Sequence, residues 1–260
     1  MLKRLIGVIT VKDGWAVQSL GYSRHLPLGR PEIIAENFDR WQVDEIVVLA
    51  IDRTLSGAEP DFATMERIAS RRIMTPLCYA GGVRGAEDAV ALVRAGADRI
   101  ALDALFQDDP TACRAIAAAI GRQATIRICP AHRDEDGGVV AYDYRTKTTL
   151  GKLADVAREH EDTFSELMVV DWRHEGSLGG FDMGLIAPLE QSGLQIIAFG
   201  GISTKPQVTA LMGTECVSAV AVGNSLSYRE LAPRQLVTVT EVDKAREVSF
   251  GDVTRGAREW

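Results

Sequence analysis

The chain has 260 residues, of which 46% are hydrophobic and 25% are charged, and its formal net charge is −7 at neutral pH. Acidic and basic residues are interleaved, so no cluster of lysines and arginines is present that could displace counterions from a nucleic acid or an anionic membrane. We therefore expect neither kind of partner. Because no linker or low-complexity segment divides the chain, we expect a single domain over residues 1–260.

The four cysteines lie far apart and include no C-x-x-C pair, which indicates neither a zinc site nor a disulfide framework. We expect them to be buried apolar residues, and we expect no metal and no other cofactor. No apolar run reaches the roughly 18 residues needed to span a bilayer. The first residues reach Asp13 too soon for a signal peptide and contain no small-residue cleavage site. These features predict a cytoplasmic protein.

Eight short apolar runs rich in β-branched residues alternate with helical segments along the chain. The predicted strands are residues 5–11, 45–51, 76–80, 98–103, 125–129, 166–171, 195–200 and 218–223. Runs that are apolar on both faces are typical of parallel strands covered by helices. Eight such βα units predict an α/β fold of the (β/α)8 or TIM barrel type.

Glycines mark the turns of this predicted barrel. Gly81-Gly82 and Gly200-Gly201 each end a strand and lie about half a chain apart, which indicates two similar halves. The triplet 136–138, Asp-Gly-Gly, is a hairpin signal, so we expect a β-hairpin excursion above the barrel after strand five. Segment 19–31 contains Gly21 and Gly29, and we expect it to be a mobile loop that closes over the barrel.

Several motifs occur in a characteristic order and spacing: VKDG (11–14), AGGV (80–83), AGADRIAL (95–102), EGSLGGFD (175–182) and FGGIST (199–204). In this order they resemble the cyclase subunit of imidazole glycerol phosphate synthase, a histidine-biosynthesis barrel, over nearly the whole chain. The resemblance implies a barrel that receives ammonia from a separate glutaminase subunit docked at its bottom. It also implies a phosphorylated, ribose-bearing substrate at the top.

The family has a ring of alternating charges at the bottom entrance, which here would be Arg4, Glu45, Arg99 and Glu166. Each of them starts a predicted strand. Opposite charges that alternate around a pore can satisfy one another where single charges would be costly to bury. The alternative is that they are solvated charges at strand ends. Asp98 matches a family position at the glutaminase interface.

The resemblance also implies phosphate-binding loops, whose small residues let a phosphate approach backbone N–H groups. The residues expected to bind phosphate are Gly82, Gly176, Gly201, Gly223 and Asn224. The alternative is that these glycines only form tight turns. Two of these segments depart from the family: its Asp before Gly176 is Glu175, and its Asn-Thr pair after strand four is Asp103-Ala104. Since a carboxylate repels a phosphate, the second change suggests a ligand without a second phosphate.

The family's two catalytic aspartates end strands one and five, where this chain has Thr10 and Pro130, and neither side chain can act as a general acid or base. Because side chains alternate faces along a strand, an inward Arg99 places Asp103 inward as well. We predict Asp103 as the acid/base or sugar-hydroxyl ligand, His132 as a second titrating group and Thr10 as an inward catalytic hydroxyl. The alternatives are a helix-capping Asp103 and an exposed loop histidine.

Charges retained at the bottom and acids lost at the top favour a diverged paralogue of the cyclase subunit, a lyase or cyclase fed with ammonia by a glutaminase. Its substrate would be another phosphosugar or a sugar that receives an amidine. The segment GYSRHLPLG (21–29) also resembles family members associated with surface-polysaccharide genes. Two alternatives are the histidine-pathway cyclase acting on its ribonucleotide with shifted catalytic residues, and a non-catalytic partner that binds a phosphosugar or activates a glutaminase.

Overall fold

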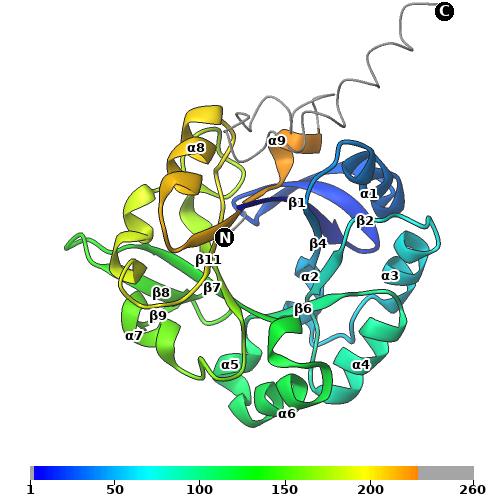
Figure 1. Cartoon of the computed structure of the whole chain (residues 1–260), viewed down its shortest axis with the longest axis horizontal. Coiled ribbons are helices and arrows are strands. Elements are labelled where there is room, and N and C mark those ends of the chain that lie inside the picture. Colours follow the sequence, from blue (N-terminus) through cyan, green and yellow to red (C-terminus); the bar gives the residue numbers. More distant parts are fainter. Residues whose placement is uncertain (1–2, 228–260) are drawn as a thin grey trace, which may run out of the picture.

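The computed structural model describes residues 3–227, and within them the eight expected strands close into a parallel (β/α)8 barrel (Figure 1). The barrel strands are β1 (Arg4–Lys12), β4 (Glu45–Ala50), β5 (Leu77–Ala80), β6 (Arg99–Leu102), β7 (Thr125–Arg133), β10 (Glu166–Asp171), β11 (Ile196–Phe199) and β12 (Val217–Val222). Strand β1 pairs with both β4 and β12, and the β7–β10 pairing completes the ring. The expected barrel is confirmed. The remainder of the expected single domain, residues 1–2 and 228–260, lies outside the described residues.

Helices surround the barrel (Figure 1). They are α1 (Pro31–Arg40), α2 (Ile51–Ser56), α3 (Phe62–Ala69), α4 (Ala86–Arg94), α5 (Leu105–Asp108), α6 (Pro110–Ile120), α7 (Leu153–Arg158), α8 (Lys205–Gly213) and α9 (Asn224–Ser227), with 3-10 turns at Arg122–Ala124, Trp172–His174, Met183–Leu185 and Ala187–Leu189. Pro110 opens α6, where no N–H is needed, and the Asp109 side chain accepts the N–H of Ala112 at 3.0 Å. None of the helices in residues 3–227 is long and apolar enough to cross a membrane.

Two antiparallel hairpins extend from the carboxyl ends of the barrel strands. After the barrel, β7 continues and pairs with β8 (Val139–Asp143), which pairs with β9 (Thr148–Lys152), so the expected excursion is confirmed. Segment 19–31 forms most of a second hairpin, β2 (Trp15–Leu20) with β3 (Arg24–Gly29). The expected loop between β1 and α1 therefore contains paired strand residues, and its closing over the barrel stays a prediction.

Side chains inside the barrel form one apolar cluster, and those between strands and helices form another. Ala101 and Val170 lie in the inner cluster, as expected for residues two and four positions after Arg99 and Glu166. Phe38 of α1 belongs to the outer cluster. All four cysteines are free and buried, as expected. The alternation along each strand therefore places the charged ends and the apolar middle of the barrel on one inner surface.

Candidate functional site

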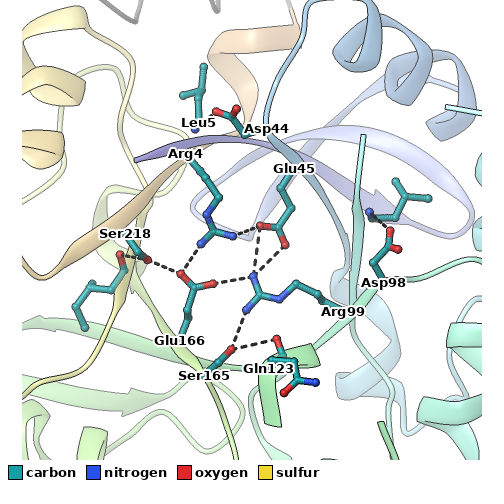
Figure 2. Close-up of polar contacts among 12 residues, drawn as sticks. Arg4, Leu5, Asp44, Glu45, Asp98, Arg99, Gln123, Ser165, Glu166 and Ser218 are labelled. Carbon is teal, nitrogen blue, oxygen red and sulfur yellow. Dashed lines mark hydrogen bonds and ion pairs between the residues drawn. The ribbon is translucent and has the colours of Figure 1, made fainter. Parts of the chain in front are cut away.

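The bottom of the barrel, where the strands begin, holds a closed ring of four charged side chains (Figure 2). Arg4 Nη1 lies 2.8 Å from Glu45 Oε2, and the same guanidinium pairs with Glu166. Arg99 Nη1 lies 3.3 Å from Glu45 Oε1 and 2.7 Å from Glu166 Oε2. Each arginine thus pairs with both glutamates, and the structure brings together the four residues expected at the entrance.

Burial and the neighbouring charges shift the pKa values of the two carboxyl groups in this ring in opposite directions. Glu45 is only 2% exposed, and burial raises its pKa even though Arg99 and Arg4 oppose the shift. Burial also opposes ionisation of Glu166, but Arg4, Arg99 and a hydrogen bond from Ser218 hold its pKa below the usual value. The alternative of solvated strand-end charges does not fit a carboxylate as buried as Glu45.

Aspartates next to the ring hold the backbone of the barrel bottom. Asp98 Oδ2 accepts the N–H of Leu77 at 2.8 Å, and Asp44 Oδ2 accepts the N–H of Leu5 at 2.7 Å (Figure 2). These bonds tie the start of one strand to the loop before its neighbour. Asp98, matched in the sequence to a partner-interface position, therefore has a structural role within this chain.

The top of the barrel contains a cavity of about 550 Å³ at the carboxyl ends of β1, β10, β11 and β12. Five of the predicted site residues line it, namely Thr10, Gly176, Gly201, Gly223 and Asn224. Gly82 does not line it. The Gly82 N–H donates to Thr54 Oγ1 at 3.1 Å, and a Cβ at Gly82 would lie 2.7 Å from the Ala58 carbonyl oxygen. Gly82 was matched to the family's other phosphate loop, in the opposite half of the mouth, and its N–H there is already used by Thr54 of α2.

Two of the cavity glycines are required by the backbone. Gly201 has φ +70° and a Cβ there would lie 2.7 Å from the His174 carbonyl oxygen, and Gly176 has φ +75°. Within residues 3–227 the N–H groups of Gly176 and Gly201 donate to no other protein group. None of the side chains that line the cavity is basic. An anion bound here would therefore be held by backbone donors.

The β2–β3 hairpin lines one side of this cavity and is held there by two cavity residues, Glu175 and Asn224. Asn224 Oδ1 accepts the Ser19 N–H at 3.3 Å, and Asn224 Nδ2 donates to the Ser19 carbonyl at 2.5 Å. Glu175 accepts the Ser19 hydroxyl at 3.1 Å and the Tyr22 N–H at 2.9 Å. Burial raises the pKa of Glu175, while these hydrogen bonds oppose the shift. The Asn224 side chain, expected to bind phosphate, is engaged in holding the hairpin.

The opposite half of the mouth is filled by side chains. Asp103, directly after β6, accepts the Tyr144 hydroxyl on Oδ2 at 2.6 Å. Asp103, Pro130 and Tyr144 line a second hollow of only about 10 Å³. Tyr144 lies in the turn between β8 and β9, and sequence reasoning missed it. The one available signal was an aromatic residue within the predicted excursion.

His132 lies on the extension of β7 and is buried, so the alternative of an exposed loop histidine was wrong. Its Nδ1 accepts the Trp172 Nε1–H at 3.0 Å, and its ring packs edge-on against Tyr142 at 5.3 Å. Burial, followed by the charge of Arg173, lowers the pKa of His132. It lines neither hollow. The three predicted catalytic residues are therefore separated, with Thr10 in the large cavity, Asp103 in the small one and His132 outside both.

A histidine–aspartate pair lies at the carboxyl end of β10, where the sequence indicated both residues but not their contact. Asp171 is 1% exposed, and its Oδ2 lies 2.8 Å from both His174 Nδ1 and the Asp182 backbone nitrogen. The pair ties the loop after β10 to the strand end. Among residues 3–227, no group of three His, Cys, Asp or Glu side chains is arranged to hold a metal ion.

Comparison with known proteins agrees with this geometry. The family described as "Histidine biosynthesis protein" matches residues 4–232. Imidazole glycerol phosphate synthase subunit HisF of Exiguobacterium sibiricum is 28% identical over 232 residues, covering 88% of this chain and 93% of that protein. The subunit of the same name from Staphylococcus epidermidis is 30% identical over 254 residues, covering 94% and 96%.

A protein of Vibrio vulnificus described as "Putative imidazole glycerol phosphate synthase subunit hisF2" is 28% identical over 242 residues, covering 90% of this chain and 88% of its own length. All three similarities extend over most of both chains. A barrel with this strand order, matched along nearly its whole length, belongs to the histidine biosynthesis protein family.

Proposed function

We propose that this protein is an ammonia-using lyase or cyclase of the imidazole glycerol phosphate synthase type, diverged toward another phosphosugar or a sugar-amidine substrate. The observation that carries the proposal is the closed ring of Arg4, Glu45, Arg99 and Glu166 at the end of the barrel opposite the cavity. Family membership supports it. The retained ring and the replaced acids together favour a changed reaction over an unchanged one.

The bottom of the barrel is the proposed docking face for a glutaminase subunit. Asp44 and Asp98 hold this end rigid through backbone hydrogen bonds, so a partner would meet a preformed surface. Met74, in the segment just before β5, is 89% exposed and offers an apolar contact at the same end. Ammonia released by the partner would pass the ring as the neutral molecule, because an ion is far more costly to bring into the apolar interior.

The top of the barrel is the proposed substrate site. The cavity N–H groups of Gly176 and Gly201 would hold the phosphate, and Thr10 would contact the substrate as a hydroxyl. Asp103 remains our candidate for proton transfer or for binding a sugar hydroxyl, since it is a carboxylate at the mouth. His132 has its Nδ1 occupied by Trp172 and lines neither hollow, so direct catalysis by His132 is not part of the proposal.

The first test is turnover of the histidine-pathway ribonucleotide with a high concentration of ammonium salt and no glutaminase, followed by absorbance. We expect no turnover by folded protein, because Thr10 and Pro130 replace both acids that the family uses. Turnover would contradict the divergence and identify the protein as the histidine-pathway cyclase with shifted catalytic residues.

The second test concerns the glutaminase, which we place with this protein in the cytoplasm. A class I glutaminase subunit from the same genome should form a 1:1 complex with the full chain. Met74→Glu should weaken that complex, whereas Leu55→Glu should not. Leu55 is a matched control because it is also an exposed apolar residue, at 62%, but lies on α2 at the carboxyl ends of the strands. Absence of any complex would contradict the ammonia-fed function, and a complex with no product from any phosphosugar would favour a non-catalytic partner.

A further inference from the structure

The two halves of the barrel mouth differ in the space they offer a ligand. One half has the cavity of about 550 Å³ lined by Gly176, Gly201 and Gly223 and also by Glu175, whose carboxylate already accepts hydrogen bonds from Ser19 and Tyr22 of the β2–β3 hairpin. The other has a hollow of about 10 Å³ lined by Asp103 and Tyr144, which is room for about one water molecule. A ligand that reaches across the mouth therefore meets two chemically different ends.

The polar groups of the small half are already engaged with one another. The Gly82 N–H donates to Thr54 Oγ1 at 3.1 Å, and the Thr54 side chain lies close enough to the Tyr144 phenol to influence its pKa. The Tyr144 hydroxyl donates to Asp103 Oδ2 at 2.6 Å. The backbone donor that an anion would need is thus occupied. The position that an anion would take is bordered by a carboxylate.

The basic side chains of this half are also paired. Arg53 Nε lies 3.6 Å from Asp52 Oδ2, and Arg53 Nη2 lies 3.6 Å from Asp61 Oδ2. Arg145 Nη1 lies 2.5 Å from Asp108 Oδ2, and its Nη2 lies 3.0 Å from Asp143 Oδ2. Each guanidinium thus faces two carboxylates, so its charge is already largely compensated before an anion binds beside Asp103. A second phosphate would meet the Asp103 charge uncompensated.

What this half does offer is hydrogen bonding to neutral or cationic groups. Within residues 3–227, Asp103 accepts one hydrogen bond, on Oδ2, which leaves Oδ1 as an acceptor for a ligand. Tyr22 lies at the turn of the β2–β3 hairpin, close enough to Glu175 and Asp103 for both carboxylates to influence its pKa. Burial, followed by these charges, raises the pKa of Tyr22, so its phenol remains a neutral hydrogen-bonding group.

We propose that the β8–β9 hairpin is a specificity element: its Tyr144, paired with Asp103, makes the site select a ligand with a single phosphate and a hydroxyl-bearing or amino-bearing far end. The phosphate occupies the glycine-lined cavity, and the far end donates hydrogen bonds to Asp103. This inference rests on the proposed function only in requiring that the glycine cavity bind phosphate.

The test compares two probes that differ only in one phosphate. Fructose 6-phosphate and fructose 1,6-bisphosphate are titrated against the full chain by calorimetry. We expect the monophosphate to bind about tenfold more tightly, because the bisphosphate must place an anion beside Asp103. In Asp103→Asn, which removes the charge and keeps an oxygen for the Tyr144 hydroxyl, the preference should shrink about tenfold. Asp155→Asn, a control that removes an exposed charge on α7, should keep the wild-type ratio.

The outcomes separate this inference from the function on which it rests. Equal or tighter binding of the bisphosphate, or an unchanged ratio in Asp103→Asn, would overturn the inference while leaving the phosphate cavity intact. A folded Asp103→Asn is recognised by its circular dichroism. If neither sugar phosphate nor inorganic phosphate binds, the phosphate cavity itself is refuted, and the inference with it. Tyr144→Phe provides an independent variant, which should weaken monophosphate binding by leaving Asp103 less well positioned.

Discussion

Replacing Arg99 by methionine should destabilise the protein more than its single charge implies. Arg99 Nη1 lies 3.3 Å from Glu45 Oε1 and 2.7 Å from Glu166 Oε2, and its Nη2 donates to Ser165 at 3.0 Å. Without Arg99 both glutamates share Arg4 alone. Removing one partner of a buried ion pair costs about 3–5 kcal/mol, because the remaining charge is left uncompensated.

The lower end of that range applies here, because Glu45 and Glu166 keep Arg4 as a partner. We therefore expect a loss of about 3 kcal/mol. For a domain of this size that loss corresponds to a fall in Tm of about 6–12 °C. Methionine has a similar length and leaves no large cavity, so the loss reports charge and not packing.

The stability difference between the wild type and Arg99→Met should change with pH in a definite direction. In the wild type the pKa of Glu166 is held low, so its contribution is present above the ordinary carboxyl pKa and is lost as pH falls through the folded value. In Arg99→Met the pKa values of Glu45 and Glu166 both rise, and the penalty is relieved as pH falls through those raised values. Urea unfolding of both proteins should therefore show a smaller difference near about pH 5 than at pH 7.

Arg84→Met is the matched control, because Arg84 lies just before α4, is 58% exposed and forms its ion pair with Asp88 in the first turn of that helix. Its urea midpoint should equal that of the wild type. An Arg99→Met protein as stable as the wild type at neutral pH would refute the reasoning that the ring is a mutually compensating set of buried charges. A stability difference that grows on acidification would refute it as well.

Three further predictions concern other parts of the barrel. Arg127 on β7 is 1% exposed, donates to the Val156 carbonyl at 2.7 Å and stacks on Phe106 at 4.6 Å. Arg127→Met should therefore lower the free energy of unfolding, measured by urea denaturation, by about 2–4 kcal/mol. A change near zero would contradict this structural role. Burial raises the pKa of Glu175 in the folded protein, so the ionised carboxylate destabilises the fold above that pKa. The stability of Glu175→Gln relative to the wild type should therefore increase from pH 4 to pH 7. A difference that does not change with pH would contradict the raised pKa of Glu175. Gly201→Ala should abolish binding of inorganic phosphate, because φ +70° and the His174 carbonyl at 2.7 Å exclude a Cβ; equilibrium dialysis that finds unchanged binding would count against the cavity as an anion site.

Strand periodicity was the strongest source of correct prediction. The eight apolar runs each became a barrel strand, and alternation from the inward Arg99 and Glu166, which the family resemblance had indicated, correctly placed Ala101 and Val170 inside the barrel. A strand exposes alternate residues to one face whatever its neighbours are, so this information is local and can be taken from the sequence.

The top of the barrel was less predictable, because its residues belong to loops and hairpins whose docking is not local. Asn224 was expected to bind phosphate, yet its amide holds the backbone of Ser19, which lies 205 positions away in the chain. His132 was expected to titrate at the site, yet it packs against Tyr142 and Trp172. No pattern within either segment indicates which distant backbone or ring it will meet.

The sequence by itself determined the barrel, its excursion after strand five, the inward charged ring and the glycines that leave backbone donors open at one side of the mouth. The barrel and the excursion depend on periodicity and on a local turn, whereas the ring and the glycines were identified through the family's motifs. The tertiary structure alone decided that the β2–β3 hairpin is fastened over the cavity and that Tyr144 reaches Asp103 to fill the opposite half. Those contacts form only when closure of the ring brings strand ends distant in sequence to the same edge, because hydrogen bonds between loops are set by where the closed barrel places them.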